Sequence, residues 1–108
     1  MIRPQTCALI LAGGLSSRMG AGFKPLLTLD GVSALALVAD TFRRAGVADI
    51  IVATGHRSAE VSVEAERIGI RAVYNPDYET GMFSTVKAGL TAVASGTTEL
   101  CITPVDVP

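Results

Sequence analysis

The chain has 108 residues, of which 49% are hydrophobic and 18% are charged, and its formal net charge is −1. This length corresponds to one domain at most, and the composition excludes a disordered chain. The near-neutral charge argues against nucleic acid or an anionic membrane as a partner, and without a signal peptide or an apolar run of roughly 20 residues the cytoplasm is the expected location.

Hydrophobic patterning predicts strands and helices in alternation along the chain. The first is a continuously apolar segment, Cys7 to Ala12, which predicts a strand buried on both faces of a sheet. The later elements that we expect are a short extended piece at 25–29, a turn at 30–31, a helix at 32–45, a strand at 49–54, a helix at 58–68, a strand at 70–74, a helix from 80 to about 94 and a strand at 99–105.

Capping residues and apolar spacing support the predicted helices. Asp30-Gly31 can cap the first helix, and Ser58 is a good N-cap for the second. The side chains that we expect to face inward are Leu35, Val38, Ala39 and Phe42 in the first helix and Val86, Leu90 and Val93 in the third. Cys7 and Cys101 fall in apolar strands, so we expect buried, unreactive thiols rather than a disulfide or a metal pair.

The alternation predicts an α/β fold with three α/β/α layers, Rossmann-like, around a mostly parallel sheet. In such sheets the ligand lies at the carboxyl edge of the strands. We therefore expect four segments to converge there: the glycine-rich run after Ala12, Thr54-Gly55-His56, Asn75 to Met82, and Asp106.

The last predicted strand would leave a sheet edge that further strands normally cover. We therefore expect residues 1–108 to be the N-terminal, nucleotide-binding part of a larger domain, truncated at its C-terminus. An uncovered edge could also pair with a second copy, so a homodimer through this edge is a second expectation.

The glycine-rich run after the first strand predicts an anion-binding turn. Gly13 and Gly14 allow a ligand to approach the backbone amides closely, and Arg18 and Lys24 add positive charge. A polyphosphate is the natural ligand for such a turn. The alternative is a solvated loop with exposed cations, and the spacing excludes both the dinucleotide-binding and the Walker glycine motifs.

The run Leu11-Ala12-Gly13-Gly14-x-Ser16-x-Arg18-Met19-Gly20, followed by Lys24, resembles the signature of nucleotidyltransferases that use a nucleoside triphosphate to cap a small phosphorylated or sugar-like acceptor. Within these it is most similar to the molybdenum-cofactor group, which makes molybdopterin guanine or cytosine dinucleotide. The resemblance implies a nucleotide-diphospho-sugar transferase type of fold. The usual spacing from Met-Gly to Lys is two residues, whereas Ala21, Gly22 and Phe23 make three here. The extra residue can make the turn bulge and so alter how far Lys24 reaches into the site.

The resemblance also implies roles for individual residues. The backbone of Leu11, Ala12 and Gly13 faces the base and ribose. Gly14 and Ser16 complete this part of the nucleotide site. Arg18 and Lys24 stabilise the leaving pyrophosphate.

Asp106 is the candidate magnesium ligand. It follows an apolar strand, where an unpaired buried charge would be costly, and Mg²⁺ usually takes one or two carboxylates together with phosphate oxygens. The alternative is a cap at the strand end. In the resembled family an Asp in an Asp-x-Pro context, as in Asp106-Val107-Pro108, holds the catalytic metal.

A second segment, Asn75-Pro76 followed by Gly81-Met82-x-Ser84, leads into a helix N-terminus that offers free N–H groups. This pattern is similar to the nucleotide-recognition segment of the molybdenum-cofactor group, particularly its cytidylyltransferase-like branch. The alternative is an ordinary loop with Met82 packed inward. His56 lies at the same edge, but a helix-entry residue is the preferred interpretation.

The leading hypothesis is a Mg²⁺-dependent nucleotidyltransferase that transfers NMP from CTP or GTP to a phosphorylated acceptor, with molybdopterin suspected and CTP slightly favoured. A sugar-1-phosphate nucleotidyltransferase is the second enzyme hypothesis. A regulatory module that binds nucleotide without turning it over is the alternative from another class. A small domain without a ligand is the remaining one.

Overall fold

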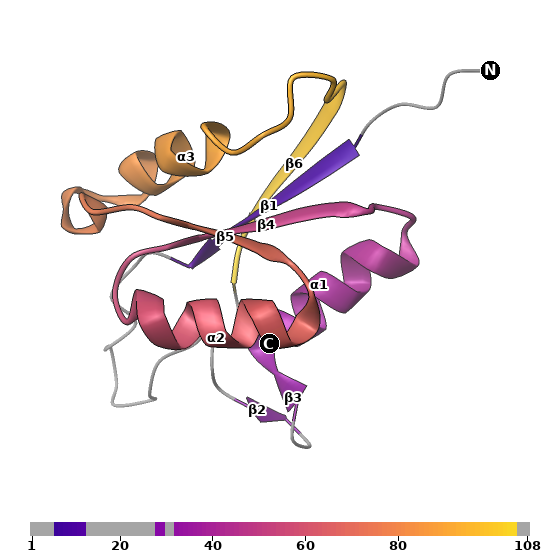
Figure 1. Ribbon diagram of the computed structural model, residues 1–108, viewed down its shortest axis with the longest axis horizontal. Coiled ribbons are helices and arrows are strands. Elements are labelled where there is room, and N and C mark those ends of the chain that lie inside the picture. The colour runs from indigo at the N-terminus through magenta and orange to yellow at the C-terminus, as the bar shows by residue number, and fades with distance from the viewer. Residues whose placement is uncertain (1–5, 13–27, 30–31, 106–108) are drawn as a thin grey trace.

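The computed structural model describes residues 6–12, 28–29 and 32–105, and it confirms the predicted α/β class (Figure 1). The main sheet is parallel, in the order β5-β4-β1-β6, and a two-stranded antiparallel ribbon pairs β2 with β3. The elements are β1 (Thr6–Ala12), β2 (Thr28–Leu29), β3 (Val32–Ser33), α1 (Ala34–Arg44), β4 (Asp49–Thr54), α2 (Ser58–Ile68), β5 (Arg71–Tyr74), the 3₁₀ helix η3 (Tyr78–Thr80), α3 (Met82–Leu90) and β6 (Glu99–Pro104).

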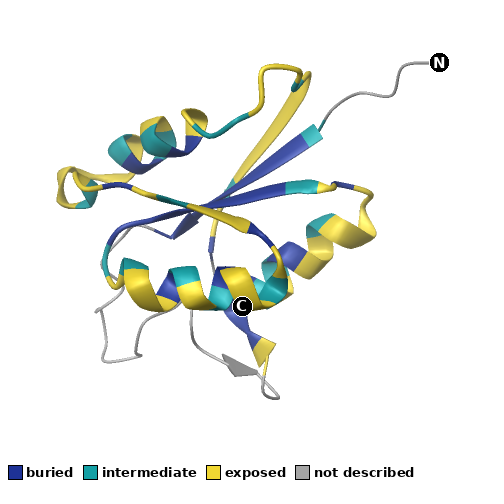
Figure 2. Cartoon of the chain, in the orientation of Figure 1, coloured by how far each residue is buried: buried dark blue, intermediate teal, exposed yellow. Residues whose placement is uncertain are grey.

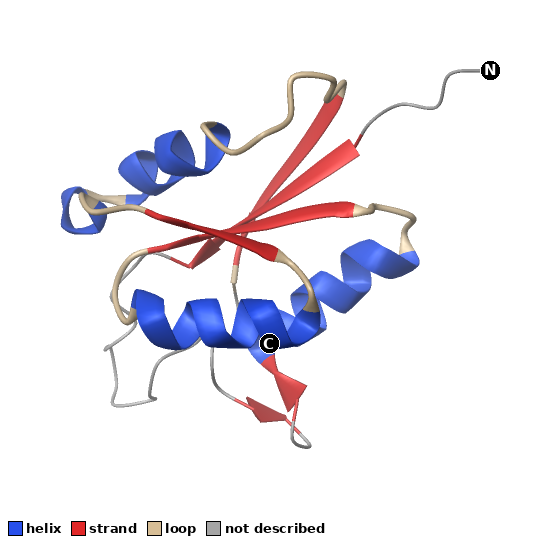
Figure 3. Ribbon diagram, viewed as in Figure 1, coloured by secondary structure: helices blue, strands red, loops and turns tan. Residues whose placement is uncertain are grey.

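Strand β1 lies in the middle of the sheet and is buried on both faces, as its apolar run predicts. Alternate side chains point to opposite faces of a strand. Ala8, Ile10 and Ala12 pack into the core cluster that contains α1 and α2 residues, whereas Cys7, Leu9 and Leu11 pack with residues from and after α3. Figures 1 and 3 show the result, with α3 on one face of the sheet and α1 and α2 on the other.

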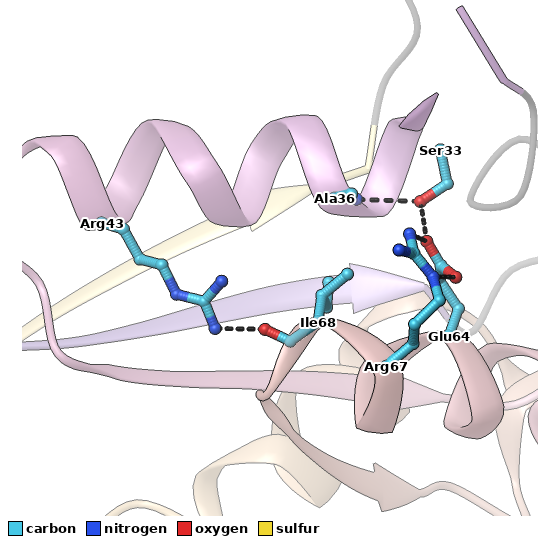
Figure 4. Close-up of polar contacts among 6 residues, drawn as sticks. All are labelled: Ser33, Ala36, Arg43, Glu64, Arg67 and Ile68. Atoms are coloured by element: carbon cyan, nitrogen blue, oxygen red, sulfur yellow. Dashed lines mark hydrogen bonds and ion pairs between the residues drawn. The ribbon is translucent and has the colours of Figure 1, made fainter. Parts of the chain in front are cut away.

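Helix α1 begins two residues later than the predicted 32–45 helix, and its N-cap is Ser33. The Ser33 hydroxyl oxygen accepts a hydrogen bond of 3.0 Å from the Ala36 amide and donates to Glu64 of α2 (Figure 4). The predicted cap Asp30-Gly31 lies outside the described residues. The inward face is confirmed, since Leu35 and Ala39 are buried and Val38 and Phe42 pack against the core.

Helix α2 has the predicted bounds but a different cap. Arg57, in the left-handed region at φ 56°, is the N-cap, and Ser58 is the first helical residue. The Arg57 carbonyl accepts from the Glu60 amide at 3.1 Å, and its guanidinium Nε donates to the Glu60 carboxylate at 2.7 Å. The prediction that Ser58 caps this helix was therefore wrong.

Helix α3 ends at Leu90 rather than near residue 94, and one of the three residues predicted to face inward is exposed. Thr85 and Gly89 are the buried positions, whereas Leu90 is 44% exposed. Val86 and Val93 do pack against the core, as expected. None of the helices that the structure describes is long and apolar enough to cross a membrane.

Strand β6 pairs with β1 along one edge, and its side chains are largely exposed (Figure 2). Leu100 is 36% and Ile102 45% exposed. Cys101 is also exposed, which corrects the expectation of two buried thiols, although Cys7 is fully buried and both cysteines are free. The cause is the position of β6 at the end of the sheet, with no further described strand beside it.

Candidate functional site

The carboxyl ends of the central strands lie side by side and bring together segments that are distant in sequence. Ala12 is in register with Thr54, and Thr54 with Tyr74. The Asn75 amide then donates a 2.7 Å hydrogen bond to the Thr54 carbonyl. In Figure 1 this edge lies on the left, where η3 and the start of α3 are found.

The end of β1 presents backbone rather than side chains to this edge. Leu11 and Ala12 are 7% and 4% exposed, because their side chains belong to the two cores. Five of the predicted site residues follow in the sequence and lie outside the described residues. They are Gly13, Gly14, Ser16, Arg18 and Lys24.

The chain that leads to Asp106 also reaches the end of β1. Val105 is 8% exposed, and its amide donates a 3.0 Å hydrogen bond to the Leu11 carbonyl. Asp106 itself lies outside the described residues, within which no group of three or more His, Cys, Asp or Glu side chains could hold a metal ion. The magnesium role of Asp106 stays a prediction.

Asn75 is the central polar residue of the loop between β5 and α3. It is 2% exposed. Its Nδ2 donates to Ser84 Oγ at 2.9 Å and to Thr85 Oγ1 at 3.1 Å, and its Oδ1 accepts from the Asp77 amide at 2.9 Å. In the part of the chain that the structure describes, no buried side-chain nitrogen or oxygen lacks a hydrogen-bond partner.

The predicted recognition residues Gly81, Met82 and Ser84 lie at the start of α3. The Ser84 hydroxyl is within donating distance of the carbonyls of Gly81, at 2.7 Å, and Asp77, at 2.9 Å, so its hydrogen already has acceptors in the loop. Met82 is 62% exposed and Phe83 75% exposed. Met82 therefore does not pack inward, whereas the choice between an ordinary loop and a recognition segment stays a prediction.

An open hollow of about 450 Å³ lies between this loop and one side of α3. Its polar lining includes Asn75, Asp77, Thr80, Ser84, Lys87 and Thr91. The Lys87 ammonium is also 5.7 Å from the centroid of the Phe83 ring, within the range of a cation–π contact. The hollow thus combines a cation with several hydroxyl groups.

His56 and Tyr78 connect the loops after β4 and β5, since their ring centroids are 6.2 Å apart at an interplanar angle of 48°. His56 directly precedes the cap of α2, which agrees with its interpretation as a helix-entry residue. Sequence reasoning missed Tyr78 and Thr85 and gave Asn75 no individual role. Adjacent hydroxyl residues in the first turn of a helix that follows an Asn-Pro turn were the available signal.

The carboxyls with lowered pKa values lie on α2. A hydrogen bond from Arg57 lowers the pKa of Glu60, and hydrogen bonds from Arg67 and Ser33 lower the pKa of Glu64. Burial, reinforced by Asp49, raises the pKa of the Cys7 thiol. Each shift has a structural cause in a side-chain ion pair or in the core.

The chain belongs to the family of MobA-like NTP transferase domains, whose model matches residues 8–108. The structure is similar to that of a nucleotidyl transferase from Methanothermobacter thermautotroptrophicus, with a TM-score of 0.82, 27% identity and coverage of 96% of this chain and 51% of that one. It is also similar to the CTP:phosphocholine cytidylyltransferase of Streptococcus pneumoniae, with a TM-score of 0.61 and 25% identity. The match covers 69% of this chain and 35% of that one.

A curated relative whose name does not describe a nucleotidyl transferase is the nicotine blue oxidoreductase of Paenarthrobacter nicotinovorans. It is 30% identical over 105 residues, which are 97% of this chain and 51% of the relative. The chain therefore spans about half the length of the relatives that it matches along nearly all of its residues.

Proposed function

We propose that the intact protein transfers a nucleotidyl group from CTP or GTP to a phosphorylated acceptor and releases pyrophosphate. The observation that carries the proposal is the meeting of three segments at one strand edge: Leu11 at the end of β1, the Asn75 loop attached to Thr54, and Val105 hydrogen-bonded to Leu11. Membership in the MobA-like family and the likeness to two nucleotidyl transferases support the same reaction class.

In this proposal the chain's own residues bind and orient the nucleotide. The backbone from Leu11 to Gly14, together with Ser16, would contact the base and ribose, and the segment Gly81 to Ser84 would supply further contacts to them. Arg18 and Lys24 neutralise the charge that develops on the departing pyrophosphate. The acceptor phosphate is already ionised, so no strong general base is needed for its attack on the α-phosphorus.

Asp106 would hold Mg²⁺, which supplies Lewis-acid polarisation of the phosphate oxygens when bound. The acceptor proposed is molybdopterin, with CTP slightly preferred over GTP because Gly81-Met82-x-Ser84 is similar to the cytidylyltransferase-like branch. Residues 1–108 would form the nucleotide-binding part of a larger domain, with the exposed edge of β6 as the surface for a homodimer. The supply of nucleoside triphosphates makes the cytoplasm the proposed location.

The test is pyrophosphate release by the intact protein with Mg²⁺ and CTP or GTP, using molybdopterin or a sugar 1-phosphate as acceptor. Release with molybdopterin is the expected result, and Lys24→Ala should reduce it. Arg44→Ala, which removes an exposed cation on α1, should leave it unchanged. Release with the sugar phosphate alone would replace the acceptor, whereas nucleotide binding without release in any mixture would indicate the regulatory module.

A second candidate is an oxidoreductase, because the relative with 30% identity carries that name. A reductant such as a nicotinamide dinucleotide would have to bind without the dinucleotide-binding glycine spacing, which the run after Ala12 lacks, and pass a hydride to a reducible acceptor. Oxidation of NADH or NADPH that depends on an added aromatic acceptor, together with no pyrophosphate release, would select this reaction over nucleotidyl transfer.

A further inference from the structure

We propose that Asn75 is a positioning residue of the candidate nucleotide site: it orients the Ser84 hydroxyl, and through it the peptide group between Gly81 and Met82. The inference rests on the proposed function, in which Gly81, Met82 and Ser84 recognise the nucleotide. It gives Asn75 an effect on ligand binding that is separate from its contribution to stability.

Asn75 connects the end of β4 with the first turn of α3. Its backbone amide donates to the Thr54 carbonyl at 2.7 Å, which attaches it to the sheet edge. A side-chain amide has two donor hydrogens, and here one reaches Ser84 Oγ and the other Thr85 Oγ1. With 2% exposure and all these bonds formed, the side chain has one orientation.

This orientation fixes the direction of the Ser84 hydroxyl. Because Asn75 Nδ2 donates to Ser84 Oγ, the hydroxyl hydrogen points away from Asn75. The acceptors within reach are the Gly81 carbonyl, at 2.7 Å, and the Asp77 carbonyl, at 2.9 Å. Through Ser84, Asn75 therefore influences the position of the Gly81 carbonyl, which precedes α3.

The Gly81 carbonyl in turn determines where the Met82 amide points. The peptide unit is planar and trans, so a carbonyl held by Ser84 directs the Met82 N–H to the opposite side. This amide belongs to the first turn of α3, whose N–H groups have no acceptor within the helix. It is thus a donor of fixed direction at the entrance to the proposed site.

The backbone at Gly81 shows why such support is needed. Its φ of 119° and ψ of 173° lie in a region that essentially only glycine adopts. A backbone segment in this region keeps one geometry when its surroundings hold it. The Gly81 carbonyl accepts from the Ser84 amide at 3.2 Å and lies 2.7 Å from the Ser84 hydroxyl, whose direction Asn75 sets. The neighbouring Met82 and Phe83 are 62% and 75% exposed, so a ligand can reach this segment.

The test measures the dissociation constants of Mg²⁺-CTP and Mg²⁺-GTP by calorimetry on the intact protein. In Asn75→Asp the shape is kept, but the new carboxylate attracts the Ser84 hydroxyl hydrogen and withdraws it from the Gly81 carbonyl. We expect the preferred nucleotide to bind about tenfold more weakly, as for the loss of one well-placed hydrogen bond.

Two controls separate positioning from stability. Ser33→Ala removes a buried hydroxyl on the other face of the sheet, and Thr85→Val removes the second acceptor of Asn75 without touching Ser84. Both should keep the dissociation constant within about twofold of wild type, even where they lower the melting temperature. Ser84→Ala, which removes the hydroxyl that bonds the Gly81 carbonyl, tests the relay in case Asn75→Asp does not fold: it should weaken binding of the preferred nucleotide, and unchanged binding would overturn the relay.

A double variant tests the relay itself. If Asn75 acts through Ser84, then Asn75→Asp combined with Ser84→Ala binds no more weakly than Ser84→Ala alone. If the losses of affinity in Asn75→Asp and Ser84→Ala multiply in the double variant, the relay is overturned. It is also overturned if Asn75→Asp has the same dissociation constant as Ser33→Ala. In both cases a wild-type protein that binds nucleotide leaves the proposed function standing, whereas a wild-type protein that binds neither nucleotide overturns both.

Discussion

Leu9 of β1 occupies the space into which any side chain at Gly89 of α3 would project. A Cβ atom at Gly89 would lie 3.0 Å from Leu9 Cγ and still nearer to its two methyl carbons. Glycine at this position therefore determines how closely α3 packs on the sheet. Because the loop of Asn75 leads directly into α3, this contact also bears on where the candidate site lies.

Gly89→Ala is expected to destabilise the protein. Alanine in a helix is ordinarily favoured over glycine by about 0.5–1 kcal/mol, but overpacking against Leu9 costs about 1–3 kcal/mol and outweighs it. The free energy of unfolding from urea titration should fall. Gly96→Ala is the control, because a Cβ there meets nothing within 4 Å. A Gly89→Ala protein more stable than wild type would show that α3 is not this close to β1.

Ser33→Ala should lower the free energy of unfolding by about 1–2 kcal/mol. It removes the N-cap bond to Ala36 and the hydrogen bond to Glu64 that joins α1 to α2 (Figure 4). Thr41→Ala on the exposed side of α1 is the matched control, since its hydroxyl bonds only back to Leu37 of its own helix. Equal denaturation midpoints for the two variants would contradict this role of Ser33.

Glu64 should contribute to acid sensitivity. Hydrogen bonds from Arg67 and Ser33 lower its pKa, so on acidification the unfolded state takes up a proton before the folded state does. Its contribution is present above the unfolded value of about 4.3 and is lost as the pH falls through the folded pKa. Glu64→Gln should flatten the decline of unfolding free energy with falling pH, and Glu66→Gln, exposed on the same helix, should not. Parallel curves for wild type and Glu64→Gln would refute the assignment.

The two thiols should differ in reactivity. In the 108-residue chain the exposed Cys101 should react rapidly with a thiol reagent, whereas Cys7, buried and with a raised pKa, should react only on unfolding. If residues 1–108 are part of a larger domain that covers β6, Cys101 should be protected in the intact protein. A Cys101→Ser variant identifies the reacting thiol. Equal reactivity of Cys101 in both forms would argue against a covered β6.

The strands of the main sheet and their order could be predicted, because short continuous apolar runs such as 7–12 and 50–53 are typical of buried strands. The strand β3 was not predicted, because it lies inside the expected 32–45 helix. Helix ends were harder, because several residues compete to cap them. Ser33 caps α1 through Ala36 and also donates to Glu64 of α2, a tertiary contact. Arg57 caps α2 in a left-handed conformation, which helical spacing does not indicate.

The candidate site was predicted at the level of segments rather than of bonds. That Asn75 follows a strand could be inferred from the sequence, but its bonds to Ser84 and Thr85 require α3 to pack where Gly89 lets it. Likewise, the exposure of Leu90 and Cys101 follows from the length of α3 and from the edge position of β6. Neither is encoded in local periodicity.

In the proposed function, the strand edge at Leu11 binds a nucleoside triphosphate with magnesium. The most direct measurement is isothermal calorimetry of CTP and GTP, each with and without Mg²⁺, on the intact protein and its Asp106→Ala variant. We expect magnesium-dependent binding of at least one nucleotide that weakens in Asp106→Ala. Absence of binding for both nucleotides, or binding that Asp106→Ala leaves unchanged, would contradict it.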